Sequence, residues 1–209
     1  MHHPLTLWGR LSSINVRKVV WAAQEVGVPF VRHDAGLTFG VVQTPAYLAK
    51  NPNALVPLME DGDLVLWESN VIVRYLAARY APGWLYPQDL PTRFDAERWM
   101  DWQQTTLNRA GGPAFIQWIR TPAEHRQAEV IAQSVAATEP LFEQLDRHLA
   151  TRAYMAGDHF SMADIPIGCE VHRWWGLPQT RPAWPHLNAW YSRLLDRPAT
   201  QGVLDLTLS

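Results

Sequence analysis

Apolar residues along the first 80 positions follow the spacings of alternating strands and helices. The short apolar run 4–8 predicts a strand, and residues 15–26 carry valine and alanine at the three- and four-residue intervals of a helix face. Gly27 suits the position just after a helix, and Pro29 prevents its continuation. A second strand is predicted at 30–33. Because a helix joins these two strands, we expect them to be parallel.

A β-hairpin and another helix are predicted to complete this half of the chain. Residues 56–67 form two apolar segments around Asp61-Gly62, a dipeptide favoured in tight hairpin turns. Residues 68–80 follow with apolar positions at helical spacing, and a short helix is expected earlier, at 45–50. The predicted order is therefore strand, helix, strand, linking loop, two strands and helix.

Composition changes at 81–91, where three prolines and a glycine indicate a linker. Beyond it the apolar spacing is helical almost throughout, so 92–209 is predicted to be an all-helical domain and 1–80 a mixed α/β domain. Pro140 is expected to kink or split the longest of these helices. The expected helices cover residues 93–110, 122–150, 161–175 and 185–197.

The composition narrows the class of protein. The chain of 209 residues is 47% hydrophobic and 18% charged, which favours a folded core over disorder. Its net charge of −2 argues against a nucleic-acid partner, because such proteins usually carry a clustered basic surface. No apolar stretch approaches the ~18 residues of a membrane span, and the N-terminal apolar run is too short for a secretory signal. We therefore expect a soluble cytoplasmic protein without a membrane or nucleic-acid partner.

Residues that bind metals or nucleotides do not occur at the spacings such sites require. Cys169 is the only cysteine, which excludes an internal disulfide and a site built from several thiolates. Its apolar neighbours predict a buried core residue. The histidines form no His-x-x-x-His pair, and no glycine-rich phosphate-binding motif is present. Ser161 and Asp164 have the spacing of a capping box and are interpreted as structural. We expect no bound metal.

Ser12 and Ser13 lie between the first predicted strand and the first predicted helix, where two interpretations compete. A serine or Asn15 at this point is an ordinary helix N-cap, accepting a hydrogen bond from an unpaired backbone N–H. Alternatively, a hydroxyl and the positive end of the helix hold an anion such as a thiolate. Spacing alone favours the capping interpretation.

Glu68 and Ser69 stand where the predicted hairpin ends and a helix begins, so either residue could cap that helix. They also suit an α-amino acid group, with Glu68 pairing its ammonium and Ser69 and the helix N-terminus receiving its carboxylate. Pro57 opens the first strand of the hairpin, where a proline cannot donate to the ladder. A cis bond or a trans proline at a sheet edge would each explain it.

Together these segments resemble the soluble glutathione transferases over essentially the whole chain. The most specific stretch is NPNALVPLMEDGDLVLWESNVIVRYLAARY, residues 51–80. Two segments of the helical half match independently: GDHFSMADI, residues 157–165, and RPAWPHLNAWYSRLLDRPA, residues 181–199. The similarity is greatest to serine-type bacterial members akin to the theta class. It implies a thioredoxin-like N-terminal domain, a helical C-terminal domain and a homodimer.

The resemblance also implies glutathione as co-substrate and assigns residues to it. The bond before Pro57 would be cis, and the backbone of Val56 would pair with the cysteinyl part of glutathione. Glu68 and Ser69 would hold the γ-glutamyl end. Relatives often supply His, Lys or Gln to the glycine carboxylate, whereas this chain has Val42 and Ala54 at the corresponding places. The residues that could substitute are Gln43, Lys50 and Asn53.

The position that meets the sulfur corresponds to Ser13, because of its two-residue spacing to Asn15, which we expect mainly to cap the helix. Ser12, one step away, remains an alternative. Tyrosine-type relatives have a tyrosine at the end of the first strand, where this chain has Trp8-Gly9. The chain also lacks the cysteine of cysteine-type relatives, which argues against disulfide exchange through an enzyme thiol.

The function implied is conjugation of glutathione, as a thiolate, to a small electrophile. Trp8, Arg109 and Trp118 are assigned by expectation to a second-substrate pocket between the domains. Two alternatives stay open. One is a non-catalytic member that carries ligands or binds proteins, and the other is a glutathione-dependent dehalogenase, peroxidase or isomerase.

Overall fold

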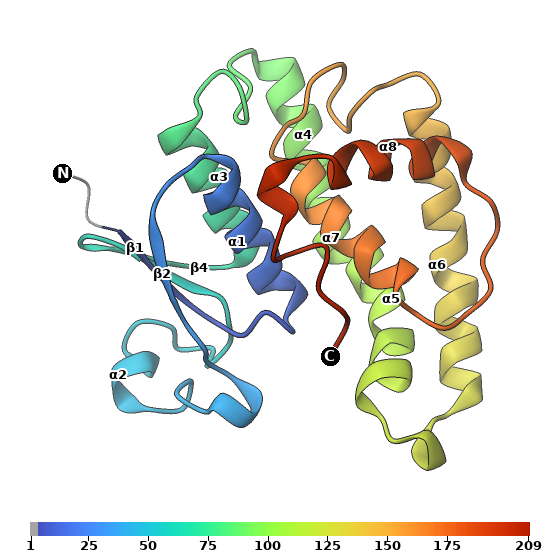
Figure 1. Cartoon of the computed structure of the whole chain (residues 1–209), viewed down its shortest axis with the longest axis horizontal. Coiled ribbons are helices and arrows are strands. Elements are labelled where there is room, and N and C mark those ends of the chain that lie inside the picture. Colours follow the sequence, from blue (N-terminus) through green and yellow to red (C-terminus); the bar gives the residue numbers. More distant parts are fainter. Residues whose placement is uncertain (1–3) are drawn as a thin grey trace.

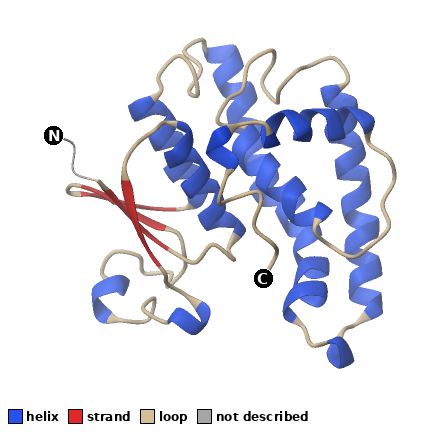
Figure 2. Ribbon diagram, viewed as in Figure 1, coloured by secondary structure: helices blue, strands red, loops and turns tan. Residues whose placement is uncertain are grey.

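The computed structural model describes residues 4–209. Its four-stranded sheet, red in Figure 2, has the order β2-β1-β3-β4. In this sheet β1 and β2 are parallel and the remaining neighbours are antiparallel. The parallel pairing and the hairpin at Gly62 confirm the predicted order of elements. The strands are β1 (Leu5–Trp8), β2 (Phe30–His33), β3 (Leu58–Asp61) and β4 (Leu64–Trp67).

Three helices belong to the sheet domain: α1 (Ile14–Glu25), α2 (Pro45–Leu48) and α3 (Ser69–Tyr80). The helical domain contains α4 (Leu90–Trp102), α5 (Asn108–Phe115), α6 (Ala128–Leu149), α7 (Asp164–Trp175) and α8 (Pro185–Leu195). Two π-helical segments follow α4 and α5, namely η2 (Gln103–Leu107) and η3 (Ile116–Arg120). Short 3-10 turns occur at η1 (Leu37–Phe39), η4 (Ala123–His125) and η5 (Pro198–Thr200).

α1 lies between the sheet and the helical domain, where it packs on α7 (Figure 1). The helices approach closely because α7 carries Gly168 at the contact: a Cβ there would lie 2.8 Å from the Trp21 ring and from Leu194. Trp21 is fully buried at this contact. The first turn of α1 is thereby held against the helical domain, and the candidate site is built around that turn.

The helical domain begins inside the segment expected to be a linker. α4 starts at Leu90 because Asp89 caps it, its carboxylate accepting from the Thr92 N–H at 3.0 Å. Pro91 fits the first turn, where a helix needs no proline N–H. The helix predicted over 93–110 continues through the two π-helical segments to Arg120.

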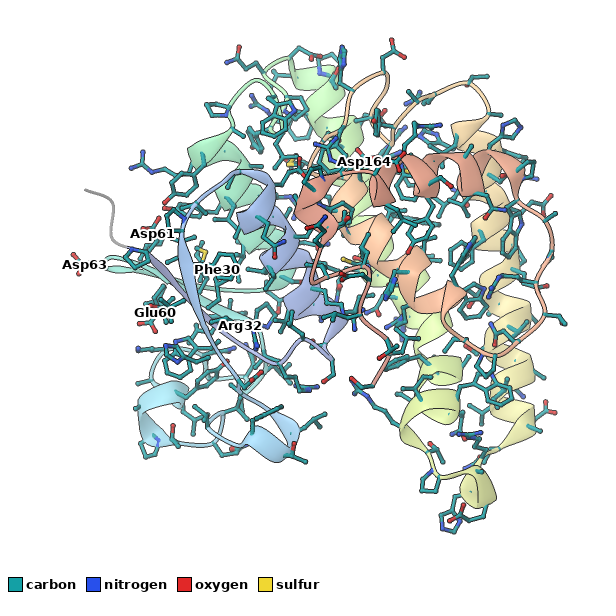
Figure 3. The ribbon with its side chains drawn as sticks, viewed as in Figure 1. Phe30, Arg32, Glu60, Asp61, Asp63 and Asp164 are labelled. Atoms are coloured by element: carbon teal, nitrogen blue, oxygen red, sulfur yellow. The ribbon has the colours of Figure 1, made fainter. Side chains whose placement is uncertain are left out.

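Three further expectations concern single residues of this domain. Pro140 was expected to kink or split this helix, but α6 runs unbroken through it, so a split is wrong: packing against α5 and α8 outweighs the lost hydrogen bond. Cys169 is buried as predicted, and burial raises the pKa of its thiol to about 12. Asp164, labelled in Figure 3, is the first residue of α7, and its carboxylate accepts from the Ser161 N–H at 2.8 Å and from the Trp190 indole N–H of α8 at 2.8 Å. Its role is structural, as expected.

Residues 4–209 contain neither a membrane-spanning helix nor a cluster of metal-binding side chains. Within residues 4–209 no helix has the length and apolar character needed to cross a membrane. The same residues contain no cluster of three or more His, Cys, Asp or Glu side chains arranged to hold a metal ion.

Candidate functional site

The hydroxyl of Ser13 does not cap α1. Ser13 occupies the N-cap position with an extended backbone, and its side chain makes no capping hydrogen bond. Asn15 is the second residue of the helix rather than its cap, so the expectation that it mainly caps α1 is wrong. Neither side chain satisfies a backbone N–H of the first turn. The Val16 N–H donates to the Ser13 carbonyl at 3.0 Å, so the N–H groups of Ile14 and Asn15, together with the helix dipole, are the ones available to an anion at this end of α1.

The start of α3 contacts the start of α1 directly. The Ser69 hydroxyl is buried and donates to the Asn15 side-chain oxygen at 3.2 Å. Glu68 stands at the N-cap position of α3, but its side chain makes no capping bond. Its backbone has φ 71° and ψ 108°, a conformation that costs a non-glycine residue free energy and that recurs at ligand sites. Capping therefore does not account for Glu68.

A small cavity of about 110 Å³, here the α3 cavity, opens between these helix ends and the hairpin. The Val56-Pro57 peptide bond on its wall is cis, as the resemblance to the glutathione transferases implies. Gln104, from η2 of the helical domain, also lines it. The other lining residues that carry polar side chains are Asn15, Asn51, Asn53, Glu68 and Ser69.

A larger cavity of about 280 Å³, here the interdomain cavity, lies on the other side of the first turn of α1. Asn15 lines both cavities, whereas Ser12 and Ser13 line only this one. Phe115 and Ile116 supply an apolar wall from the helical domain. The arrangement places two separate cavities beside one helix end, the α3 cavity with mostly polar lining and the interdomain cavity with an apolar wall.

Arginine dominates the charge of the interdomain cavity. Arg10, Arg17, Arg120 and Arg173 line it, and the described residues that line it include no Asp or Glu. His172 also lines it and is held by the Leu206 carbonyl at 2.9 Å. Burial, and after it the charge of Arg17, lowers the pKa of His172 to about 4, so the imidazole is neutral near pH 7.

A buried polar network that the sequence did not reveal connects the two cavities. Lys18 of α1 is fully buried, and its ammonium donates to Gln103 at 2.7 Å and to Gln104 at 3.0 Å. Gln103 donates in turn to Glu170 at 2.8 Å, which is paired with Arg173. Burial lowers the pKa of Lys18 to about 8, partly offset by Glu170. The network thus runs from Gln104 in the α3 cavity to Arg173 in the interdomain cavity.

Several residues expected at the site lie elsewhere. Lys50 forms an ion pair with Glu60 at 2.6 Å on the sheet, away from both cavities (Figure 3 labels Glu60). Trp8 donates to the same carboxylate at 2.7 Å and lines neither cavity. Arg109 is exposed, and Trp118 donates to Gln179 at 3.1 Å outside the cavity walls. The second-substrate assignment of these residues has no support in the geometry.

Of the loop residues expected near the glycine carboxylate of glutathione, one lines a cavity and the others do not. Asn53 lines the α3 cavity, and its side chain donates to Asn51 at 3.2 Å. Val42, Ala54 and Gln43 line neither cavity. Of the proposed substitutes, Asn53 alone is placed where it could contact a peptide in the α3 cavity.

A thioredoxin-like α/β domain joined to a helical domain, with a polar groove at a cis-proline, defines a class of two-domain proteins. Residues 3–78 match the glutathione S-transferase N-terminal domain, and residues 128–193 match the glutathione S-transferase C-terminal domain. The glutathione S-transferase GstB of Escherichia coli is 40% identical over 207 residues, covering 98% of this chain and all of that protein. Mouse glutathione S-transferase theta-3 is 32% identical over 91% of this chain and 81% of its own length.

The structure agrees with these relationships. The theta class glutathione S-transferase of Xanthomonas axonopodis pv. citri, solved with glutathione bound, superposes with a TM-score of 0.96. The two are 45% identical, and the match covers the whole of both chains. The chain therefore belongs to the glutathione S-transferase family and is an enzyme of that class.

Proposed function

We propose that this chain binds glutathione in the α3 cavity and conjugates it, as a thiolate, to a small electrophile in the interdomain cavity. The γ-glutamyl end contacts Glu68 and Ser69, and the cysteinyl backbone pairs with Val56 beside Pro57. The sulfur then lies at the first turn of α1, next to Ser13. The observation that carries the proposal is the Ser69–Asn15 hydrogen bond, which joins the Glu68 end of the groove to the Ser13 helix end.

We assign the Ser13 hydroxyl as the hydrogen-bond donor to the glutathione thiolate, because no structural role occupies this hydroxyl. It makes no capping bond, lies within the cavity wall and is held at a helix N-terminus. One hydroxyl donor and the helix end together stabilise an anion by a few kcal/mol. Lowering a thiol pKa by about two units requires about 2.7 kcal/mol. This suffices to make a substantial fraction of bound glutathione ionised near neutral pH.

The reaction needs no covalent enzyme intermediate. The thiol proton leaves to solvent, the thiolate sulfur forms a bond to the electrophilic carbon, and the leaving group departs with the electrons of its broken bond. The protein contributes proximity, since the two cavities meet at Asn15, and stabilisation of the sulfur charge. The thiol of Cys169 takes no part, because burial keeps it protonated.

A homodimer in the cytoplasm completes the proposal. Apolar side chains remain exposed on β4, α3 and α4, among them Trp67, Val71 and Phe94. Such side chains gathered on neighbouring elements favour a protein interface. Sedimentation equilibrium is expected to give twice the chain mass of 23.8 kDa.

Titration of glutathione by calorimetry, followed by conjugation assays, tests the proposed function. We expect saturable binding at one site per chain and turnover of 1-chloro-2,4-dinitrobenzene, a reactive neutral electrophile. Binding without turnover of any electrophile would favour a carrier or interaction protein instead. Absence of binding would contradict the proposal.

A further inference from the structure

Two arginines that line the interdomain cavity, the half-buried Arg10 and the more exposed Arg120, have few partners within the fold. Arg10 follows β1, and its Nε is buried without a hydrogen-bond partner. Arg120, at the end of η3, donates to the Ser12 carbonyl at 3.3 Å and lies 4.9 Å from the Phe115 ring centre. Neither guanidinium has an ion pair among the described residues.

The other two arginines of this cavity are accounted for by the fold. Arg173 is paired with Glu170, which belongs to the buried network. Arg17 donates to the Leu11 carbonyl at 2.7 Å and to carbonyls of the C-terminal segment at 2.8–3.1 Å. These two side chains hold α7 and the C-terminal segment in place. Arg10 and Arg120 have no comparable structural task.

Each of these two arginines also carries a like charge from a neighbouring arginine of the cavity. Partial burial lowers the pKa of Arg10, and the positive charge of Arg120 lowers it further. Partial burial and the charge of Arg173 lower the pKa of Arg120 in the same way. Like charges in a shared, partly desolvated space are unfavourable unless an anion offsets them. The cavity is thus electrostatically complementary to a negative group.

The position of Arg120 relates this charge to the reaction. Its bond to the Ser12 carbonyl holds it next to the serine pair, and Phe115 and Ile116 form an apolar wall beside it. From this geometry we infer that the second substrate is an electrophile carrying a carboxylate, which Arg10 and Arg120 receive while its apolar body packs on Phe115. The inference rests on the proposed function and specifies its substrate class.

The reaction with a halogenated aromatic carboxylate balances without a further reactant. Glutathione thiolate attacks the ring carbon that bears chlorine, a carbon–sulfur bond forms and the carbon–chlorine bond breaks. Chloride leaves with the bonding electron pair, and the thiol proton has gone to solvent. The carboxylate is unchanged and serves only for binding and orientation.

A matched pair of electrophiles separates charge from shape: 4-chloro-3-nitrobenzoate and 4-chloro-3-nitrobenzamide. For each, kcat/KM is divided by the uncatalysed rate constant with glutathione, which removes their different intrinsic reactivity. We expect the benzoate to be favoured by about 10-fold or more, as a charged hydrogen bond allows. Replacement of either cation, Arg120→Gln or Arg10→Gln, should lower the benzoate value by about 10-fold and change the benzamide value less than about twofold.

Arg147→Gln is the control, because it removes one positive charge from α6, where Arg147 is exposed and paired with Glu143. This substitution should leave the ratio of the corrected kcat/KM values for the two electrophiles unchanged. Thermal unfolding of each variant confirms that it is folded. Equal losses on both electrophiles would mean that the arginines act on the thiolate and would overturn the inference. Equal corrected kcat/KM values of the unmodified chain for the benzoate and the benzamide would also overturn it. Failure of glutathione to bind in calorimetry, in contrast, contradicts the proposed function itself.

Discussion

The two cavities beside the first turn of α1 share Asn15 but differ in charge and in origin. The α3 cavity is built almost wholly from the sheet domain and combines one carboxylate, Glu68, with amides and a hydroxyl. The interdomain cavity combines the α1 end with the helical domain, and its charged lining residues are arginines. The first suits a ligand with an ammonium and a peptide backbone, and the second suits an anion. One helix end can therefore receive a thiolate from one side and its reaction partner from the other.

The largest expected effect is at the junction of the cavities. Ser13→Ala removes the hydroxyl next to the proposed sulfur position and should reduce conjugation by about 10- to 1000-fold, as loss of one anion-stabilising donor does. Steady-state kinetics with 1-chloro-2,4-dinitrobenzene measures this loss.

Ser12→Ala is the matched control for the serine pair. Ser12 is held through its backbone carbonyl by Arg120, so loss of its hydroxyl should cost much less activity. A large loss with Ser12→Ala and a small one with Ser13→Ala would exchange the roles of the two serines.

The next effect concerns Glu68, the carboxylate that lines the α3 cavity. Glu68→Gln should weaken glutathione binding by about 1–3 kcal/mol, or roughly 5- to 150-fold, because it removes the charge that pairs the ligand ammonium. The fold should persist, since the Glu68 side chain makes no capping bond. Calorimetry measures the affinity, and Glu124→Gln on η4 is the control for loss of one surface charge. Unchanged affinity would remove Glu68 from the site.

His172 in the interdomain cavity should make the stability of the folded chain depend on pH in the acid range. The pKa of His172 is lowered to about 4 in the folded chain, against about 6.5 when unfolded. Between these values the unfolded chain binds the proton and the folded chain does not, so stability falls as pH falls from about 6.5 to 4. The free energy of unfolding falls by at most about 3 kcal/mol over this range, and partial exposure of the His172 ring makes the decrease smaller.

Urea unfolding at several pH values measures this dependence. His172→Gln should flatten the curve between about pH 4 and 6.5, whereas His186→Gln, at an exposed position, should not. An unchanged slope in His172→Gln would show that other groups control acid stability.

The smallest effect concerns the contact between the cavities. Ser69→Ala removes the hydroxyl that donates to Asn15 at 3.2 Å. We expect glutathione affinity to fall by about 0.5–1.5 kcal/mol, or roughly 2- to 12-fold, the range for one neutral hydrogen bond. An affinity loss as large as that of Glu68→Gln would mean that Ser69 receives the ligand carboxylate as its main partner.

The α3 cavity could be predicted from the sequence because its determinants are local. The cis bond at Pro57 and the pair Glu68-Ser69 lie within one continuous hairpin-helix segment whose order the apolar pattern predicts. The hydroxyl of Ser13 lies at a helix start that is equally visible in the pattern. The spacing of apolar residues does not show that the side chains of Ser13 and Glu68 make no capping hydrogen bond, because this depends on side-chain conformation.

A pocket between the domains was expected, but the residues that line the interdomain cavity could not be predicted because its contacts join distant segments. Arg120 meets the carbonyl of Ser12 across 108 positions, and Lys18 meets Gln103 across 85. The π-helical segments η2 and η3 change the phase of the helix, so a regular helical spacing misplaces the side chains of η2, η3 and the residues between them. Arg109, which was expected in the second-substrate pocket, lies next to η2 and is exposed.

Trp8 was misplaced for a simpler reason. Successive side chains of a strand point to opposite faces, and in β1 Leu5 and Leu7 are the buried pair. Trp8 therefore lies on the other face, where it contacts His33 and Tyr47. The alternation was present in the sequence, but the face that meets α1 was not known until the fold was.

The account depends most on activation of the glutathione sulfur at the end of α1. Ultraviolet absorbance of the thiolate, recorded against pH for glutathione bound to the unmodified chain, measures this directly. The account predicts an apparent thiol pKa about two units below the value of about 8.5 for a free cysteine thiol. A bound thiol that titrates at the same pH as free glutathione would contradict it.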